Sequence, residues 1–279
     1  MEYVDGWAEQ HDVEIGQVGV DGQTRRVADA VDPGACDLLV AVGGDGTTLA
    51  ALHAGAAVSR PVLGVACGSI GVLTSVTAGE VTSALDSVDG GSWTAVDVPG
   101  LDLAWGGEDR QVAINDVAVL RDGPGQALVS VTVDDVLYAR VAGDGVVVAT
   151  ALGSSAYTMA AGGPILAPGA DGMVVTPLAT HAGSCPPLVA GAGCQVTLAI
   201  EPGYGGVRYE IDGRIAPVAA DDLTVRLRPT YATLVSLAGE EPRLTGLRRR
   251  GLVLDSPRVL ARDARAAHVT PPAVTPPSP

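Results

Sequence analysis

Residues 38–52, LLVAVGGDGTTLAAL, are the stretch of sequence that decides the fold. Five apolar residues, 38–42, lead into GGDGT at 43–47 and then into a helix-compatible run at 48–52. A short apolar run bounded by glycines is typical of a buried parallel strand. The helix that follows such a turn offers free N–H groups and a positive dipole end to phosphate. We therefore expect a phosphate-binding turn in which Asp45 supplies the carboxylate.

The composition indicates a folded, acidic protein. The chain has 279 residues, of which 47% are hydrophobic, only 3% are aromatic and none is phenylalanine, so the core must be aliphatic. The net charge is −15 and the sequence contains no lysine, so every basic residue is arginine. An acidic surface disfavours nonspecific nucleic-acid binding. The lack of lysine excludes a Walker A loop.

The termini and the cysteines favour a cytoplasmic protein. No apolar run is long enough to span a bilayer, and no signal peptide opens the chain, so we expect no membrane partner. Cys36, Cys67, Cys185 and Cys194 form no C-x-x-C pair and are interpreted as reduced thiols. The four histidines show no metal-ligand spacing.

The first 92 residues are expected to form an α/β domain. Residues 1–36 indicate a helix and a connection, and no strand precedes Trp7, so either the first strand is lost or the start is late. Residues 60–66 predict a second buried strand that leads into a second glycine-rich loop at 67–73, and residues 77–85 predict a helix. Ligands bind parallel sheets at the carboxyl ends of the strands, so both glycine loops could face one site.

From about residue 93 the pattern becomes one of short strands, which predicts an all-β, sandwich-like domain over residues 93–230. The expected strands are 96–103, 111–120, 127–133, 145–150, 173–177, 195–200, 207–211 and 223–227. Residues 153–164 interrupt this rhythm as a helix closed by Gly162 and Gly163. Residues 231–267 are expected to return to the N-terminal domain, first as a strand at 231–237 and then as a solvated basic helix at 243–250. Residues 268–279 are Pro-rich and expected to be disordered.

Four stretches together resemble the NAD kinase family, whose superfamily includes diacylglycerol kinases and 6-phosphofructokinases. They are GGDGT at 43–47, residues 64–73, Asn115-Asp116 where the family typically has Asn-Glu, and residues 143–166, which include GSSAY. Thr176–His181 and Ile211-Asp212-Gly213 follow in family order. GGDGT alone is shared by several kinase families, whereas the four stretches in this order are specific.

The resemblance implies a Rossmann-like α/β N-terminal domain and a β-sandwich C-terminal domain. It also implies transfer of the terminal phosphoryl group of ATP, or of polyphosphate, to the adenosine ribose 2′-hydroxyl of NAD. Such chemistry depends on positioning and charge neutralisation, with Mg²⁺ expected near Asp45. The family further implies a homodimer or homotetramer.

The resemblance assigns roles to individual residues. Asp45 would activate the 2′-hydroxyl or orient Mg²⁺. Phosphate and nucleotide binding falls to Gly43, Gly44, Gly46, Thr47, Gly68 and Gly71. Acceptor binding falls to Asn115 and Asp116 at the ribose hydroxyls, Ser155, Ala156 and Tyr157 at the adenine end, Asp144 at the nicotinamide end, and His181.

Five of these acceptor residues have a purely structural alternative. Asn115 and Asp116 could form a strand-edge turn, and Asp144 with its following glycine could form a type I′ turn. Tyr157 could be a packed core tyrosine. His181 is more often a satisfied structural histidine.

The sequence departs from the family pattern at Leu152, where a hydroxyl is expected, at Ala160, where serine is frequent, and at Pro186, where arginine is frequent. Positions 152 and 160 align toward the nicotinamide half, and a lost hydrogen bond there costs on the order of 1 kcal/mol. Two alternatives therefore stand beside an NAD kinase. One is a kinase of the same fold that acts on another nucleoside, sugar or polyol. The other is a noncatalytic nucleotide-binding paralogue.

Overall fold

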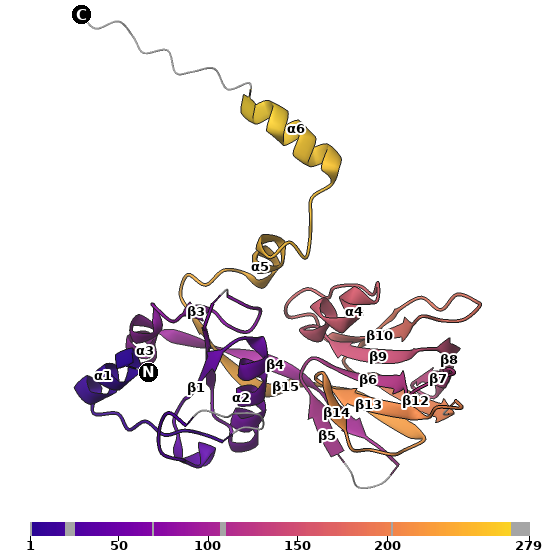
Figure 1. Ribbon diagram of the computed structural model, residues 1–279, viewed down its shortest axis with the longest axis horizontal. Coiled ribbons are helices and arrows are strands. Elements are labelled where there is room, and N and C mark those ends of the chain that lie inside the picture. The colour runs from indigo at the N-terminus through magenta and orange to yellow at the C-terminus, as the bar shows by residue number, and fades with distance from the viewer. Residues whose placement is uncertain (1, 20–25, 69, 107–109, 202, 269–279) are drawn as a thin grey trace, which may run out of the picture. The chain divides into compact units, whose positions relative to one another are not determined.

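The computed structural model describes residues 2–19, 26–68, 70–106, 110–201 and 203–268 (Figure 1). Tertiary contacts divide the chain into two compact units, Met1–Glu240 and Glu241–Pro279, and each is described by itself. The first unit contains an α/β part and a β-rich part. None of the described helices is long and apolar enough to cross a membrane.

The α/β part is built around the strand and helix on either side of the GGDGT turn. Its elements are α1 (Glu2–His11), η1 (Pro33–Ala35), β1 (Leu39–Gly43), α2 (Asp45–Val58), β2 (Val62–Ala66), β3 (Val76–Thr77) and α3 (Val81–Asp89). Strands β1 and β2 pair in parallel, as predicted. Helix α2 packs Leu49 and Leu52 into one cluster with Leu39 and Val62. Because α2 begins at Asp45, Gly46 and Thr47 belong to its first turn, whereas the sequence predicted a helix from residue 48.

The expected helix near the N-terminus is present as α1. Its Trp7 indole donates to Asp86 Oδ1 of α3 at 2.6 Å, and Trp7 packs with Val81 and Leu85. Within residues 2–19 and 26–38 the structure shows no strand, only α1, η1 and an isolated bridge between Gln17 and Ala30. The first strand of the described chain is therefore β1.

Two long strands join the α/β part to the β-rich part. Strands β4 (Trp93–Ala104) and β15 (Asp222–Leu237) pair with each other along most of their length, and the end of β15 also pairs with β2. The predicted strands 223–227 and 231–237 are thus one strand, interrupted by a shift of register between Arg228 and Ala232. Domain borders at 92/93 and 230/231 stay predictions, because these two strands run through both parts.

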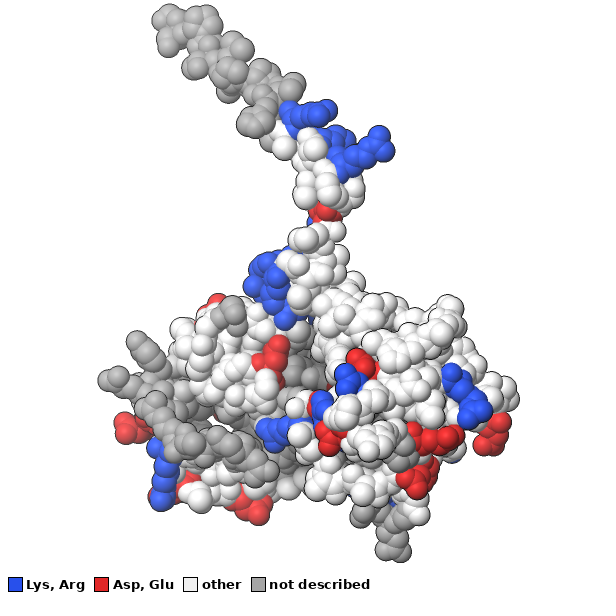
Figure 2. All heavy atoms as spheres, turned by 45° about the vertical axis from the view of Figure 1, so that its right-hand side comes forward, with Lys and Arg blue, Asp and Glu red and all other residues white. Residues whose placement is uncertain are grey.

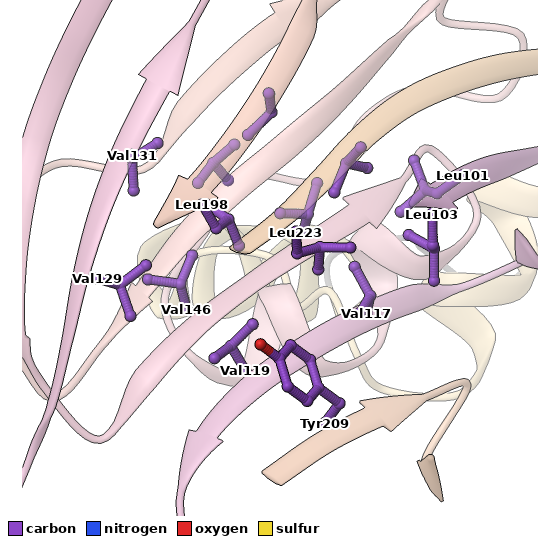
Figure 3. Close-up of a cluster of buried hydrophobic side chains, with 14 of the residues drawn as sticks. Leu101, Leu103, Val117, Val119, Val129, Val131, Val146, Leu198, Tyr209 and Leu223 are labelled. Atoms are coloured by element: carbon purple, nitrogen blue, oxygen red, sulfur yellow. The ribbon is translucent and has the colours of Figure 1, made fainter. Parts of the chain in front are cut away.

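The β-rich part is a sandwich of two sheets. The nine-stranded sheet continues through β5 (Arg110–Ala113), β12 (Gln195–Glu201), β7 (Ala127–Val133) and β8 (Val136–Gly143). The six-stranded sheet has the order β11 (Leu188–Gly191), β10 (Gly172–Leu178), β9 (Gly145–Thr150), β6 (Asp116–Arg121), β13 (Val207–Ile211) and β14 (Arg214–Ala216). Alternate residues of both sheets fill one mainly aliphatic core, whose aromatic members are Trp105 and Tyr209; Tyr209 is shown in Figure 3. The predicted fold class, α/β followed by an all-β sandwich, is confirmed.

Strand β8 was not predicted, and its position explains why. It is the edge strand of the nine-stranded sheet, and Val136, Leu137 and Tyr138 at its start are all exposed. Three consecutive exposed apolar residues break the alternation by which a half-buried strand is recognised. Residues 153–164 form two short turns, η2 (Gly153–Ser155) and α4 (Tyr157–Ala160), where a single helix was expected.

The second unit contains α5 (Arg243–Arg249) and α6 (Pro257–His268). As predicted for 243–250, Arg248 and Arg249 of α5 are exposed, and they pair with Asp255 and Glu241 at 2.7 and 2.9 Å. Residue 268 ends α6, and the rest of the predicted tail, 269–279, lies outside the described residues.

Candidate functional site

The two glycine loops meet at the Asp45 carboxylate. Asp45 Oδ2 accepts the N–H of Val72 at 2.9 Å, and Oδ1 accepts the N–H of Leu73 at 2.8 Å. The N–H of Cys67 donates to the Gly43 carbonyl at 3.2 Å, which joins the loops a second time. Asp45 is partly exposed, so its carboxylate is held at the surface at the end of β1 and the start of α2. The two glycine loops therefore lie together, as expected from strands that end on the same edge of the sheet.

The predicted phosphate-binding residues belong to the two glycine loops that meet at this carboxylate. Gly44, Gly46, Thr47 and Gly68 are exposed, and Gly43 and Gly71 are partly exposed. Gly44 is the N-cap residue of α2, so the positive end of the helix dipole opens at the same place. The helix has 14 residues, long enough for its N-terminus to favour an anion.

Gly71 packs directly against the Asp45 carboxylate, and a side chain at this position would displace it. A Cβ on Gly71 would lie 2.1 Å from Asp45 Oδ1, whereas one on Gly79 would meet nothing within 4 Å. We expect Gly71→Ala to lower kcat by about tenfold, since a shift of an ångström can misalign a reacting group. Gly79→Ala is the matched control and should keep the wild-type rate. Steady-state kinetics of both variants check this, and equal rates would show that Asp45 tolerates the displacement.

The predicted acceptor pair lies at a break between two strands, not within one. The predicted strand 111–120 divides into β5 and β6, and Asn115 lies in the bend between them. Its carbonyl accepts the Thr150 N–H at 2.9 Å, and a Cβ on Gly153 would lie 2.0 Å from that carbonyl oxygen. The start of the GSSAY segment therefore packs directly on the backbone of Asn115.

Asp116 is a buried carboxyl group with an altered pKa. Its exposed fraction is 6%. Burial, together with the carboxylates of Asp212 and Glu210, raises the pKa of Asp116 to about 7. Desolvation disfavours the charged form of an acid, and neighbouring negative charges act in the same direction. Asp116 therefore changes charge near neutral pH, as functional carboxyl groups often do.

A cleft of about 470 Å³ lies on the outer face of the six-stranded sheet. It is lined by Leu120, Arg121, Gly123, Pro124, Asp144, Tyr157 and Arg208. Its volume falls within the range of small-molecule sites. Burial, followed by the charge of Glu210, raises the pKa of Tyr157, so its hydroxyl stays a neutral donor.

The cleft walls carry both signs of charge. Arg121 Nε lies 2.5 Å from Asp144 Oδ1, and Arg208 Nε lies 2.8 Å from Glu210 Oε1. On the face drawn in Figure 2, arginines and carboxylates likewise lie next to each other over the β-rich part. The walls can therefore contact a polar ligand through both donors and acceptors.

Of the other predicted acceptor residues, Asp144 and Tyr157 line the cleft and His181 does not. Asp144 connects β8 to β9, which belong to different sheets, so the alternative of a type I′ hairpin is wrong. Tyr157 is 37% exposed, so the alternative of a core tyrosine is also wrong. His181 is exposed, and its Nδ1 lies 3.1 Å from Gln126 Oε1. Ser155 donates to the Leu152 carbonyl at 3.1 Å, and Ala156 is exposed.

The departures from the family pattern lie away from the cleft walls. Leu152 is 4% exposed and belongs to the cluster that contains Leu49 and Ile114. Its side chain therefore fills the core beneath the GSSAY segment, and the inference of a missing hydroxyl toward the acceptor at this position is wrong. Ala160 and Pro186 are exposed.

Two residues of this region were not singled out as site residues from the sequence. Asp212, in the turn between β13 and β14, accepts the N–H groups of Ile114, Asn115 and Asp116 at 3.0, 2.6 and 3.3 Å. His53 of α2 contacts the same carboxylate at 2.8 Å. The signal for Asp212 was the Ile-Asp-Gly in family order, whereas nothing in the sequence marked His53.

Asp45 is the candidate ligand for a metal ion. Within residues 2–268, apart from the ones not described, no three His, Cys, Asp or Glu side chains cluster as a metal site. Asp45 is a lone carboxylate, and each of its oxygens receives one N–H bond, which leaves lone pairs free. One carboxylate together with substrate phosphates is a usual environment for Mg²⁺. The residues therefore fit a magnesium ion that arrives with a nucleotide.

The fold and the site define a class of protein in which an α/β domain with a phosphate-binding turn is joined to a β-sandwich with a polar cleft. Sequence profiles of the ATP-NAD kinase N-terminal and C-terminal domains match residues 4–91 and 114–236. The NAD kinase of Symbiobacterium thermophilum is 35% identical over 219 residues, covering 74% of this chain and 75% of the relative. That of Chloroflexus aurantiacus is 35% identical over 211 residues, covering 72% and 75%. The chain belongs to the NAD kinase family.

Solved structures share the fold. Yeast NADH kinase complexed with NADH superposes with a TM-score of 0.71 at 23% identity, covering 89% of this chain and 77% of that one. An NAD kinase from Archaeoglobus fulgidus in complex with ATP gives a TM-score of 0.71 at 24% identity, covering 88% and 92%. At these identities the likeness extends to the fold alone.

Proposed function

We propose that this chain transfers the terminal phosphoryl group of ATP to the 2′-hydroxyl of the adenosine ribose of NAD, giving NADP. The observation that carries the proposal is the Asp45 carboxylate held between two glycine loops at the N-terminus of α2, in a member of the NAD kinase family. Residues 1–92 would hold the donor, residues 93–230 the acceptor, and residues 231–267 would continue the N-terminal domain.

Asp45 is the proposed catalytic residue. Its carboxylate would accept the proton of the 2′-hydroxyl while that oxygen bonds to the terminal phosphorus and ADP leaves with the electrons of the broken bond. The GGDGT turn and the second glycine loop would bind phosphate at the positive end of α2, through Gly43, Gly44, Gly46, Thr47, Gly68 and Gly71. When bound beside Asp45, Mg²⁺ would neutralise phosphate charge. Polyphosphate is the alternative donor.

The acceptor would lie along the outer face of the six-stranded sheet. Asn115 and Asp116 would bind the ribose hydroxyls, because they stand at the break between β5 and β6 with their backbone fixed by Asp212. Ser155, Ala156 and Tyr157 would contact the adenine end. Asp144 would contact the nicotinamide end, and His181 would lie at its border.

We also propose a cytoplasmic homodimer or homotetramer. The four cysteines are free thiols, which suits a reducing compartment. The exposed residues Val136, Leu137 and Tyr138 on the edge strand β8 offer an apolar surface to a second copy. Light scattering of the purified protein measures the assembly, and a monomer at micromolar concentration would contradict this part of the proposal.

The test of the function is a panel of acceptors incubated with ATP and Mg²⁺. We expect NADP to be the main product, at a kcat on the order of 1–100 s⁻¹, as is usual for kinases. NADH, nucleosides, sugars and polyols form the remainder of the panel, and polyphosphate replaces ATP in a parallel series. Faster phosphorylation of a nucleoside or polyol would assign a different acceptor, and NAD binding without turnover would indicate a noncatalytic paralogue.

A further inference from the structure

The Asp212 carboxylate joins the turn between β13 and β14 to the backbone of residues 114–116, a contact that a simple hairpin does not require. Asp212 and Gly213 form the two-residue turn between β13 and β14, with φ angles of 51° and 75°. An Asp-Gly pair suits such a turn through its backbone angles alone, so the turn itself needs no contact from the side chain. Here the side chain is only 6% exposed and accepts three consecutive backbone N–H groups, those of residues 114–116. A buried carboxylate with these bonds fixes the backbone of the acceptor pair.

His53 is the side chain that connects this junction to the phosphate-binding turn. Its Nε2 lies 2.8 Å from Asp212 Oδ2, and its Nδ1 lies 3.1 Å from the Tyr231 hydroxyl. One neutral tautomer satisfies both contacts, because Nε2–H donates to the carboxylate while Nδ1 accepts from the tyrosine. His53 is in α2, eight residues after Asp45, which places them about 12 Å apart along the helix axis.

Tyr231, which contacts His53 Nδ1, lies where β15 passes from the sandwich to the α/β part. It lies in the register shift between Arg228 and Ala232. The Arg228 guanidinium lies 5.6 Å from the centre of its ring, and Gly100 of β4 packs so closely that a Cβ there would lie 3.1 Å from the tyrosine. The tyrosine is therefore held by both crossing strands, and His53 contacts the sandwich turn and the crossing point together.

We propose, on the basis of the proposed function, that His53 is a positioning residue that fixes the Asp45 carboxylate relative to Asn115 and Asp116 through its hydrogen bond to Asp212. The GGDGT turn belongs to the α/β part of the first unit, and Asn115 and Asp116 belong to the β-rich part. Helix α2, the Asp212 carboxylate and the strands β4 and β15 connect them rigidly. Phosphoryl transfer needs attacking and leaving oxygens in line, so a small rotation between the two parts lowers the rate without removing any ligand contact.

The test compares His53→Leu, which has no donor, with His53→Gln, whose amide N–H can still reach Asp212. We expect kcat to fall about 30- to 100-fold in His53→Leu, with the KM for ATP and for NAD changed less than about threefold. His53→Gln should recover kcat to within about fivefold of wild type. His11→Leu is the matched control. His11, in α1, also contacts an aspartate, Asp89 of α3, at 3.4 Å. This variant should keep the wild-type kcat.

A purely structural role would give a different pattern. The proposal would be overturned if both His53 variants had a lower melting temperature and lost kcat equally. An unchanged kcat in His53→Leu would also overturn it. Amide hydrogen exchange gives a second readout that needs no turnover: exchange at residues 114–116 should be at least about tenfold faster in His53→Leu than in wild type and His53→Gln. An inactive wild-type enzyme would refute the proposed function, and the exchange result would then decide the positioning on its own, with equal exchange refuting it.

Discussion

Asp45→Asn is expected to lower kcat for NADP formation by about 10³-fold while the protein stays folded. Asparagine cannot accept the proton of the 2′-hydroxyl and brings no charge to a metal ion. In the wild-type protein, the N–H groups of Val72 and Leu73 each donate to a separate oxygen of the Asp45 carboxylate. An asparagine supplies one oxygen for both, so the second glycine loop also loses a hydrogen bond, at a cost of about 1 kcal/mol.

Asp37→Asn is the matched control for this variant. Asp37 is an exposed acid that precedes β1 in the same part of the protein, so its substitution removes one charge without touching either loop. Steady-state rates with saturating ATP and NAD, together with far-ultraviolet circular dichroism, provide the measurement. A rate within tenfold of wild type in folded Asp45→Asn protein would remove Asp45 from the catalytic role and leave it as the residue that holds the two loops together.

The local part of this site could be predicted from the sequence because its signals are local. Apolar residues 38–42 followed by three glycines within four positions predict a strand, a tight turn and a helix N-terminus, and β1 and α2 lie there. The meeting of the two glycine loops also followed, since parallel neighbours end on the same edge of a sheet. The two bonds from Val72 and Leu73 to Asp45 add a detail that spacing alone does not give.

The long-range part could not be predicted, for the same physical reason. His53 and Asp212 are 159 positions apart, and their contact depends on how α2 packs against the turn between β13 and β14. The error at Leu152 has a similar origin: its alignment with a family hydroxyl suggested a ligand contact, whereas its direction places it in the core with Ile114. Strand β15 appeared as two strands because Arg228 and Pro229 interrupt the apolar pattern where the register shifts.

Asp116→Asn is expected to stabilise the protein at pH 8 and to have almost no such effect at pH 4. The pKa of Asp116 is about 7 in the folded state, against 3.8 without the fold. Below pH 3.8 both states hold the proton, so the group contributes nothing. Between pH 3.8 and 7 the folded state holds more protons, so the free energy of unfolding falls as the pH rises, by at most about 1.4 kcal/mol per unit. Above pH 7 the penalty is constant, at most about 4 kcal/mol.

Because asparagine does not titrate, the difference in unfolding free energy between Asp116→Asn and wild type isolates this one group. Urea unfolding at pH 4, 6 and 8 measures it, and Asp171→Asn, at an exposed acid just before β10, controls for the loss of one charge. A difference that does not grow with pH would show that Asp116 ionises normally. If the variant is more stable at pH 8 but has a higher KM for NAD, the buried acid destabilises the fold and is retained for binding the acceptor, because a site selected for stability alone would carry the amide.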